Sequence, residues 1–260
     1  MTTRVLLLLL LLPLLSTAQN RTGMPDYGSD AGSPWSGTPE RFRPRKKKDY
    51  LVTINTAYGP MRAVLYDQTP KHKANFINLV NRKFYDSLLF HRVIPNFMIQ
   101  GGDPNSRKAA AGGSLGNGDV AYKISAEINP TFFHKKGSLA AARDNNPEKA
   151  SSGCQFYVVQ GRVWPDDELQ KQIDRSHTRA PGRTFTDGQK QTYRTLGGSP
   201  HLDGSYTVFG EVIDGLALVD SVAKQPRDPQ DRPRQDIRMT VSGEWVRKKK
   251  ITKRYKFKYI

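Results

Sequence analysis

The sequence predicts a mainly β protein built as a closed antiparallel barrel. Short segments of alternating apolar and polar residues recur through the middle of the chain, and only two isolated helical patterns interrupt them, which is typical of small barrels. Hydrophobic residues make up 37% of the 260 residues, enough for one core but with room for sequence outside it. Glycine and proline show no repeating period, so a fibrous fold is excluded.

The first expected elements are a hairpin and a helix. Residues 50–55 and 61–66 have the composition of strands and are joined by a short turn. Thr69 and Pro70 follow, a capping residue and a proline suited to the first helical position. Apolar residues at helical spacing then continue to Phe84, which predicts the first helix.

The rest of the domain is predicted as short strands, a second helix over 216–223 and a closing strand over 237–246. The single cysteine, Cys154, excludes an intramolecular disulfide and any multi-cysteine metal site, and strand alternation predicts a buried, inert thiol. The same alternation assigns Phe90, Phe156 and Phe209 to the core. The remaining strand signals lie at residues 90–94, 97–100, 137–142, 154–160 and 206–212.

The first 18 residues have the features of a secretory signal peptide. Arg4 supplies the positive charge, residues 5–15 are apolar, and small residues follow at 16–18, which favours cleavage before Gln19. The apolar run is too short for a membrane span, which needs about 20 residues. We therefore expect an exported chain, periplasmic or extracellular, with no transmembrane segment after cleavage.

The basic character of the chain belongs mainly to its two ends. The net charge is +17, and residues 19–49 are expected to be a disordered basic linker. Residues 40–49 carry six basic and two acidic side chains, whereas the C-terminal tail, residues 247–260, carries eight basic side chains and no acidic one. Solvated tails and weak binding to an anionic envelope surface both fit this pattern, and export makes a nucleic-acid partner unexpected. The alternating residues Tyr255, Phe257 and Tyr259 also suggest a terminal strand.

Three segments of the chain carry a family resemblance. They read FHRVIPNFMIQGGD over 90–103, GSLAAAR with SSGCQFYVV over 137–159, and PHLDGSYTVFGEV over 200–212. In these segments the chain resembles the cyclophilin-type peptidyl-prolyl cis-trans isomerases. The resemblance implies an eight-stranded barrel capped by two helices over residues 50–246, interrupted by an insertion at 162–197.

The activity implied is rotation about X–Pro peptide bonds in proteins that are still unfolded or flexible. The barrier to this rotation is about 18–20 kcal/mol, because the amide has partial double-bond character. By resemblance Arg92 is catalytic: a fixed cation that donates to the prolyl nitrogen stabilises the twisted state. Gln100 is expected to bind the substrate backbone and to orient Arg92. This chemistry requires no metal and no cofactor.

The substrate-binding residues are also assigned by resemblance. Four apolar side chains are expected to hold the proline ring, and three residues are expected to follow the peptide on its other side. These two groups are Phe97, Met98, Tyr157 and Leu202, and Ala142, Arg143 and Gln155. His201 and Tyr206 complete the rim. The best-known animal members carry Trp and His at these two positions, so we expect catalysis to be retained and cyclosporin binding to be weaker.

The insertion is predicted to hold two short helices, one from residue 165 with Leu169 and Ile173 on one face, and one over 186–195. Because it ends just before His201, it is expected near the rim of the pocket, where it either selects clients or is surface decoration. Two other functions stay open beside an exported, monomeric isomerase. One is a non-catalytic scaffold that binds proline peptides, and the other is an envelope- or polyanion-binding protein that uses its basic ends.

Overall fold

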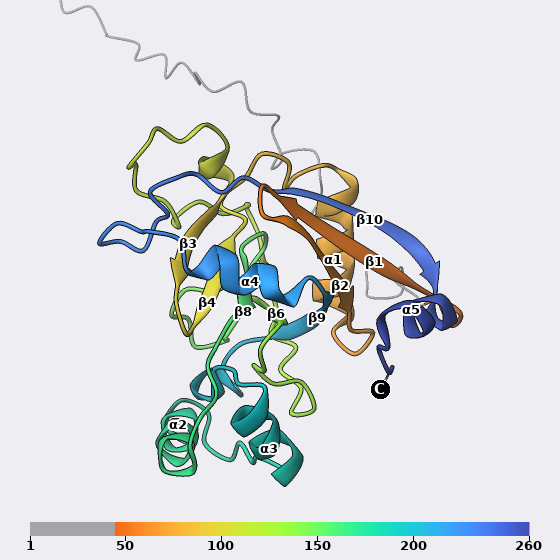
Figure 1. The fold of residues 1–260 in the computed structure, drawn as a ribbon, viewed down its shortest axis with the longest axis vertical. Helices are drawn as coiled ribbons and strands as arrows, with labels where there is room; N and C mark the ends of the chain where they lie inside the picture. The colour runs from red at the N-terminus through yellow and green to blue at the C-terminus, as the bar shows by residue number, and fades with distance from the viewer. Residues whose placement is uncertain (1–44, 260) are drawn as a thin grey trace, which may run out of the picture.

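The computed structural model describes residues 45–259, and an eight-stranded antiparallel sheet forms its centre (Figure 1). The strands follow one another in the order β10-β1-β2-β9-β6-β8-β4-β3. The sheet curls until its edges approach each other, where residues 87–90 exchange backbone hydrogen bonds of 2.8–2.9 Å with residues 237–239. The predicted mainly β fold with an eight-stranded antiparallel barrel is confirmed.

The element boundaries lie close to those expected from the sequence pattern. The strands of the main sheet are β1 (Lys48–Thr56), β2 (Gly59–Leu65), β3 (Phe90–Ile94), β4 (Met98–Gly101), β6 (Ser138–Ala141), β8 (Phe156–Val159), β9 (Val208–Asp214) and β10 (Thr240–Arg247). A second sheet pairs β5 (Lys123–Ile124) with β7 (Ser151–Ser152). The helices are α1 (Pro70–Asn81), α2 (Asp166–Arg179), α3 (Asp187–Thr195), α4 (Leu216–Ala223) and α5 (Lys248–Tyr255), with short 3-10 turns η2 (Pro104–Lys108) and η3 (Pro200–Leu202).

The first turn of α1 is capped differently from the prediction. The hydroxyl of Thr69 donates to the carbonyl of Tyr66 at 3.3 Å and makes no cap bond to the helix. The backbone amides of Lys71 and His72 instead donate to the carboxylate of Glu127, at 3.0 and 2.9 Å. Burial raises the pKa of Glu127, but the His72 ring and these two amides more than offset it, so the pKa is lowered overall. The Glu127 carboxylate, from a distant loop, therefore caps α1 in place of the Thr69 side chain.

The barrel interior is filled by apolar side chains from alternate positions of the strands, as the period-two pattern requires. Phe90, Phe156 and Phe209 are all buried there, and so is Cys154, as expected. Burial and the neighbouring Asp119 carboxylate raise the pKa of the Cys154 thiol well above its usual value. The thiol is therefore held in its unreactive, protonated form.

The insertion forms the two predicted helices, α2 and α3, which lie together below the barrel in Figure 1. They share a small apolar core that includes Leu169, Ile173 and Tyr193. Thr186 caps α3: its hydroxyl accepts from the backbone amide of Gln189, and the Gln189 side chain accepts from the Thr186 amide. The insertion is thus a small folded unit with its own core.

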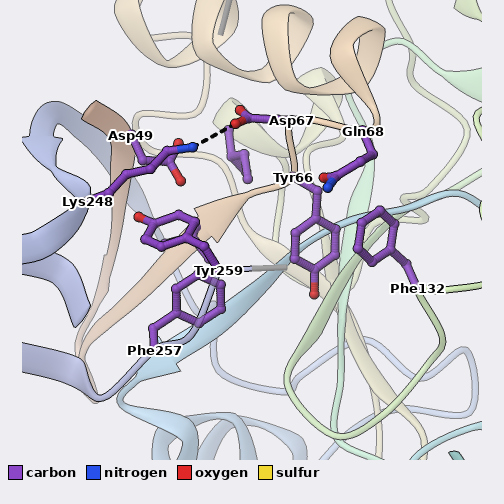
Figure 2. A pocket seen from close by; sticks show the side chains of 10 residues that line it. Asp49, Tyr66, Asp67, Gln68, Phe132, Lys248, Phe257 and Tyr259 are labelled. Atoms are coloured by element: carbon purple, nitrogen blue, oxygen red, sulfur yellow. Dashed lines mark hydrogen bonds and ion pairs between the residues drawn. The ribbon is translucent and has the colours of Figure 1, made fainter. Parts of the chain in front are cut away.

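The C-terminal segment is folded onto the barrel and does not form the suggested alternating strand. β10 runs directly into α5, and Ile251 of this helix is buried against Leu51 and Val64. The chain then returns along the barrel, so that Phe257 and Tyr259 lie beside β1 and β2 (Figure 2). A helix forms here because Ile251 and Tyr255, four residues apart, both face the barrel while the polar residues 252–254 between them stay in solvent.

The expected signal peptide and most of the expected linker lie outside the described residues. Within residues 45–259, no helix is both long enough and apolar enough to span a membrane. β1 begins at Lys48, so the last residues of the expected linker already belong to the sheet.

Candidate active site

Nine of the predicted site residues line one cavity of about 170 Å³ on the outer face of the barrel. They come from β3, β4 and β8, from the segment after β6, and from the turn around η3. The nine residues are Arg92, Phe97, Met98, Gln100, Ala142, Arg143, Tyr157, Leu202 and Tyr206. The structure therefore brings together residues that are up to 114 positions apart in the chain.

Strand register explains why these side chains meet. Gln100 on β4 pairs with Arg92 on β3 and with Tyr157 on β8, so the three residues lie side by side across the sheet. Because side chains alternate along a strand, Ile99 and Val158 point into the barrel core while their neighbours point outward. The outward-facing residues are covered by η3, which places Leu202 over the apolar floor.

Arg92 is the exposed cation of the site, with 43% of its side chain accessible. Its Nε lies 3.6 Å from a carboxylate oxygen of Asp231, and the other oxygen of Asp231 accepts from Arg227 at 3.0 Å. The Asp231 carbonyl accepts from the backbone amide of Val93 at 2.9 Å, which fixes this loop against β3. Asp231 has a φ of 66°, a left-handed conformation that aspartate tolerates better than most residues.

Asp231 was not predicted from the sequence. The segment 225–236 is rich in Arg, Pro and Asp and matches neither a helical nor a strand pattern, so nothing marked one of its acids as the neighbour of Arg92. Only the close approach of this loop to β3 identifies it. The carboxylate lies on the Nε side of the guanidinium, which leaves the two terminal nitrogens of Arg92 for a ligand.

Gln100 takes part in a short chain of amides beside the cavity. Its Nε2 donates to Oε1 of Gln155 at 3.0 Å, and Nε2 of Gln155 donates to the carbonyls of Gly116 and Gly118 at 3.0 and 2.6 Å. Gln155 therefore lines an adjoining groove of about 430 Å³ and not the cavity itself. One N–H of the Gln100 amide is used in this way, which leaves its carbonyl oxygen for a substrate amide or for Arg92 and its second N–H for a substrate carbonyl.

The loop side of the cavity is held by Arg143. Its Nε donates to the carbonyl of Ser205 at 2.9 Å, and its guanidinium lies 4.7 Å above the ring of Tyr206. It also donates to the carbonyl of Asp144 at 2.8 Å. These contacts tie the segment after β6 to the segment after η3, so the two walls of the cavity are fixed relative to each other.

His201 lies behind the rim instead of lining the cavity. Its ring packs against Phe97, with ring centroids 5.5 Å apart. Burial, together with the neighbouring His134, Arg179 and Arg175, lowers the pKa of His201 to about 4 against an opposing effect of Asp203. The imidazole is therefore neutral at physiological pH, and it supports the Phe97 ring as an aromatic side chain.

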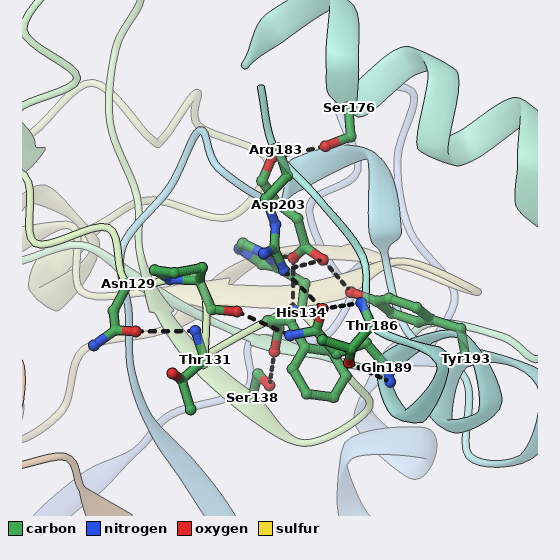
Figure 3. A network of polar contacts seen from close by, with 12 residues as sticks. Asn129, Thr131, His134, Ser138, Ser176, Arg183, Thr186, Gln189, Tyr193 and Asp203 are labelled. Carbon is green, nitrogen blue, oxygen red and sulfur yellow. Dashed lines mark hydrogen bonds and ion pairs between the residues drawn. The ribbon is translucent and has the colours of Figure 1, made fainter. Parts of the chain in front are cut away.

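A buried polar network is centred on Asp203 (Figure 3) and is joined to the cavity through Tyr157. Nδ1 of His134 donates to Asp203 at 2.7 Å, and the hydroxyl of Tyr157 lies 3.0 Å from Nε2 of the same ring. With its proton on Nδ1, a neutral imidazole accepts at Nε2, so the Tyr157 hydroxyl donates. Burial raises the pKa of Tyr157 well above its usual value, which keeps that proton in place.

The insertion contributes directly to this network. The hydroxyl of Tyr193 on α3 donates to Asp203 at 2.7 Å, and the hydroxyl of Ser176 on α2 donates to the Asp203 carbonyl at 2.9 Å. Asp203 follows Leu202, a wall of the cavity. Neither His134 nor the role of Asp203 was predicted, because both depend on contacts between segments far apart in the sequence. The insertion is therefore hydrogen-bonded to the residue beside the cavity wall, a connection that neither sequence-based alternative had included.

An apolar cavity with aromatic walls on the outside of a barrel, flanked by an exposed arginine and side-chain amides, has the features of a binding site for a small apolar ring with polar groups beside it. The family model described as cyclophilin type peptidyl-prolyl cis-trans isomerase/CLD matches residues 51–244. The chain belongs to this family, and its fold and kind of activity are those of the cyclophilin-type isomerases.

Individual relatives agree with the family assignment. The chain is 31% identical over 200 residues to a protein of Staphylococcus haemolyticus named as a peptidyl-prolyl cis-trans isomerase, which covers 76% of this chain and 93% of the relative. It is 34% identical over 189 residues to a protein of Streptococcus pyogenes named as a bifunctional phosphatase/peptidyl-prolyl cis-trans isomerase. That match covers 72% of this chain but only 37% of the longer relative.

Solved structures show the same fold. A cyclophilin type peptidyl-prolyl cis-trans isomerase of Cryptosporidium parvum superposes with a TM-score of 0.53 at 24% identity, covering 76% of this chain and 98% of that one. A second crystal structure, of the same protein in the presence of the dipeptide Ala-Pro, gives a TM-score of 0.52 at 25% identity, covering 75% of this chain and 98% of that one.

Proposed function

We propose that this protein catalyses rotation about X–Pro bonds in newly exported polypeptides that are still partly unfolded. The observation that carries the proposal is the position of Arg92 and Gln100 at the side of an apolar cavity walled by Phe97, Met98 and Leu202. The cavity offers the proline ring a fixed seat, and the arginine offers the amide nitrogen a fixed charge. A related cyclophilin was crystallised in the presence of Ala-Pro, which supports a proline-containing ligand.

The proposed mechanism needs only selective binding of the twisted amide. As the X–Pro bond rotates, the prolyl nitrogen regains its lone pair and becomes a hydrogen-bond acceptor. Arg92 donates to this nitrogen, while Gln100 holds the substrate backbone and the cavity holds the ring. Since the planar amide offers no such lone pair, the bond to Arg92 forms mainly in the transition state and lowers the barrier. A reduction of about 7 kcal/mol corresponds to about 10⁵-fold acceleration.

A direct assay separates catalysis from mere binding. The relaxation of an X–Pro peptide from cis to trans, followed by NMR without a coupled protease, should accelerate in proportion to the concentration of the chain without its signal peptide. Binding of the peptide with no acceleration would instead support the non-catalytic scaffold. Cleavage before Gln19 is checked in the same work by the mass of the chain recovered outside the cytoplasm. Recovery of the chain only from the cytoplasm, uncleaved, would argue against export.

The proposal also includes weak binding of the basic ends to an anionic envelope surface, with the chain acting as a monomer. The basic segments and the cavity use different residues, so the two properties are separable. An exported isomerase held near the membrane would meet its clients as they emerge.

His201 should determine inhibitor affinity more than turnover. We expect His201→Trp to strengthen cyclosporin binding about tenfold, because the larger indole would extend from beside Phe97 to the rim and add buried area and an N–H donor there. Peptide turnover should change by less than about twofold, since the amide twists at Arg92. Isothermal titration with the inhibitor and the NMR assay measure the two effects.

His201→Phe serves as the control for that change, because it adds apolar area without a donor. It should fall between the other two chains in inhibitor affinity. Equal affinity of the histidine and tryptophan chains would mean that the rim does not contact the inhibitor as expected.

A further inference from the structure

Two basic segments that lie about 200 residues apart in sequence meet at one end of the barrel. In the pairing of β1 with β10, Lys48 is opposite Arg247, and the amide of Lys248 donates to the carbonyl of Lys47 at 3.0 Å. The surface that results, called here the basic face, carries eleven exposed cations. They are Arg45, Lys46, Lys47, Lys48, Arg247, Lys249, Lys250, Lys253, Arg254, Lys256 and Lys258.

The basic face is held in place by the core. Ile251 is fully buried beneath α5, against Leu51 and Val64. Lys248, which is not one of the eleven, forms an ion pair with Asp67 at 2.9 Å and lies 4.8 Å over the ring of Tyr259 (Figure 2). The lysines of α5 therefore have a fixed spacing, unlike those of a loose tail.

The charge of the basic face is not neutralised by the rest of the protein. Within residues 45–259, none of the eleven cations forms an ion pair with an acidic side chain. Asp49, the acid next to Lys48, is buried and forms an ion pair with Lys73, and residues 247–258 include no acid. Two of the arginines rest on aromatic rings, Arg45 over Trp245 at 4.3 Å and Arg254 over Tyr255 at 5.3 Å. Cations gathered in this way repel one another, so the face favours an anionic partner.

We propose that the basic face adsorbs to a lipid bilayer that contains anionic phospholipids, through their headgroup phosphates. Eight of the eleven cations are lysines, compact charges that suit a dense phosphate surface better than one directional contact. The charges lie on α5, at the paired ends of β1 and β10, and in the short segments before β1 and after α5, so an extended surface can meet many of them at once. The exposed side of α5 carries lysines and no large apolar residue, which indicates adsorption without insertion.

The position of the face fits an enzyme that works beside a membrane. In Figure 1, α5 lies on the opposite side of the molecule from β3 and β4, which carry Arg92 and Gln100. Adsorption through α5 therefore leaves the cavity open to polypeptides. The choice of a bilayer over a soluble polyanion rests on the proposed export, because a translocated chain first meets the outer side of the membrane that it crossed.

The test is co-sedimentation of the chain without its signal peptide with vesicles of phosphatidylcholine, with or without phosphatidylglycerol as about one lipid in three. We expect binding only with phosphatidylglycerol, and a loss of at least about tenfold between low and high salt, because salt screens the attraction. The triple variant K249Q/K250Q/K253Q should bind at least about fivefold more weakly, since three adjacent charges are removed. Its isomerase activity should be unchanged.

The matched control is K108Q/K171Q/K224Q, which removes the same charge from exposed lysines elsewhere and should change binding less than about twofold. An equal loss of binding in both variants would show that only the net charge matters, and it would overturn the proposal that the basic face is the binding surface. Binding independent of phosphatidylglycerol would overturn the bilayer. Binding to a soluble polyphosphate at a lower phosphate concentration than to the vesicles would also overturn the choice of a bilayer as the partner. An inactive chain that still binds vesicles would contradict the isomerase proposal alone.

Discussion

Replacing Arg92 with alanine is expected to lower the isomerase kcat at least about tenfold, with little change in the affinity for a proline peptide. The side chain is 43% exposed at the side of the cavity, so its loss removes no buried support. Its donors meet the prolyl nitrogen chiefly in the twisted state, so the loss falls on kcat and not on binding. A tenfold loss of kcat corresponds to about 1.4 kcal/mol of transition-state stabilisation, which is near the lower end of what one hydrogen bond to a charged group contributes.

The lysine variant tests the geometry of the same contact. Arg92→Lys keeps the charge but loses the planar fork that reaches the nitrogen while Nε faces Asp231, so we expect it to be nearly as slow as the alanine variant. Arg82→Ala is the matched control, because Arg82 is an exposed arginine outside the cavity. NMR line-shape analysis of cis–trans exchange gives kcat and binding together. Turnover of Arg92→Ala within about twofold of the unaltered chain would contradict the mechanism.

Much of the cavity could be predicted because its residues lie in contiguous motifs. Met98 and Gln100 share β4 and Phe97 comes directly before it, and a period of two fixes which residues of the strand face the core. His201 shows the limit of this reasoning. The motif places it at the rim, but the packing of its ring against Phe97, behind the cavity, depends on side-chain positions that no local pattern encodes.

Contacts between distant segments could not be predicted. Glu127 caps α1, and Asp231 faces Arg92, yet each lies in a loop whose composition is ordinary. The C-terminal helix is a related case. The alternation of Tyr255, Phe257 and Tyr259 favours a strand locally, but burial of Ile251 and Tyr255 on one helical face outweighs it. The two basic segments meet because β1 pairs with β10, and the charge pattern of the sequence does not predict this pairing.

Asp203 should prove to be the most sensitive polar residue outside the cavity. It is completely buried and accepts hydrogen bonds from the backbone and ring of His134 and from the Tyr193 hydroxyl. In Asp203→Asn one oxygen becomes an amide nitrogen, so a buried donor of His134 or Tyr193 loses its acceptor. We expect the free energy of unfolding to fall by about 2–4 kcal/mol.

The same substitution should weaken peptide binding, because Asp203 holds Leu202 and, through His134, the Tyr157 hydroxyl. Tyr193→Phe separates the part played by the insertion: it removes one donor of α3 and nothing in the cavity. We expect a cost of about 1–2 kcal/mol and a higher KM for a short peptide, with kcat nearly unchanged. Urea denaturation and the NMR exchange assay measure these effects.

A control within the same insertion is Gln170→Ala, which removes only an exposed hydrogen bond to Asp174 and should be neutral within about 0.5 kcal/mol. If Tyr193→Phe loses stability while KM stays constant, the insertion is a folded attachment that does not support the pocket. If KM rises as expected, the insertion acts on every substrate, because Tyr193 reaches the cavity through Asp203 and not through contact with the client. Selection of clients by the insertion would then require a further effect, seen with protein substrates and absent with short peptides.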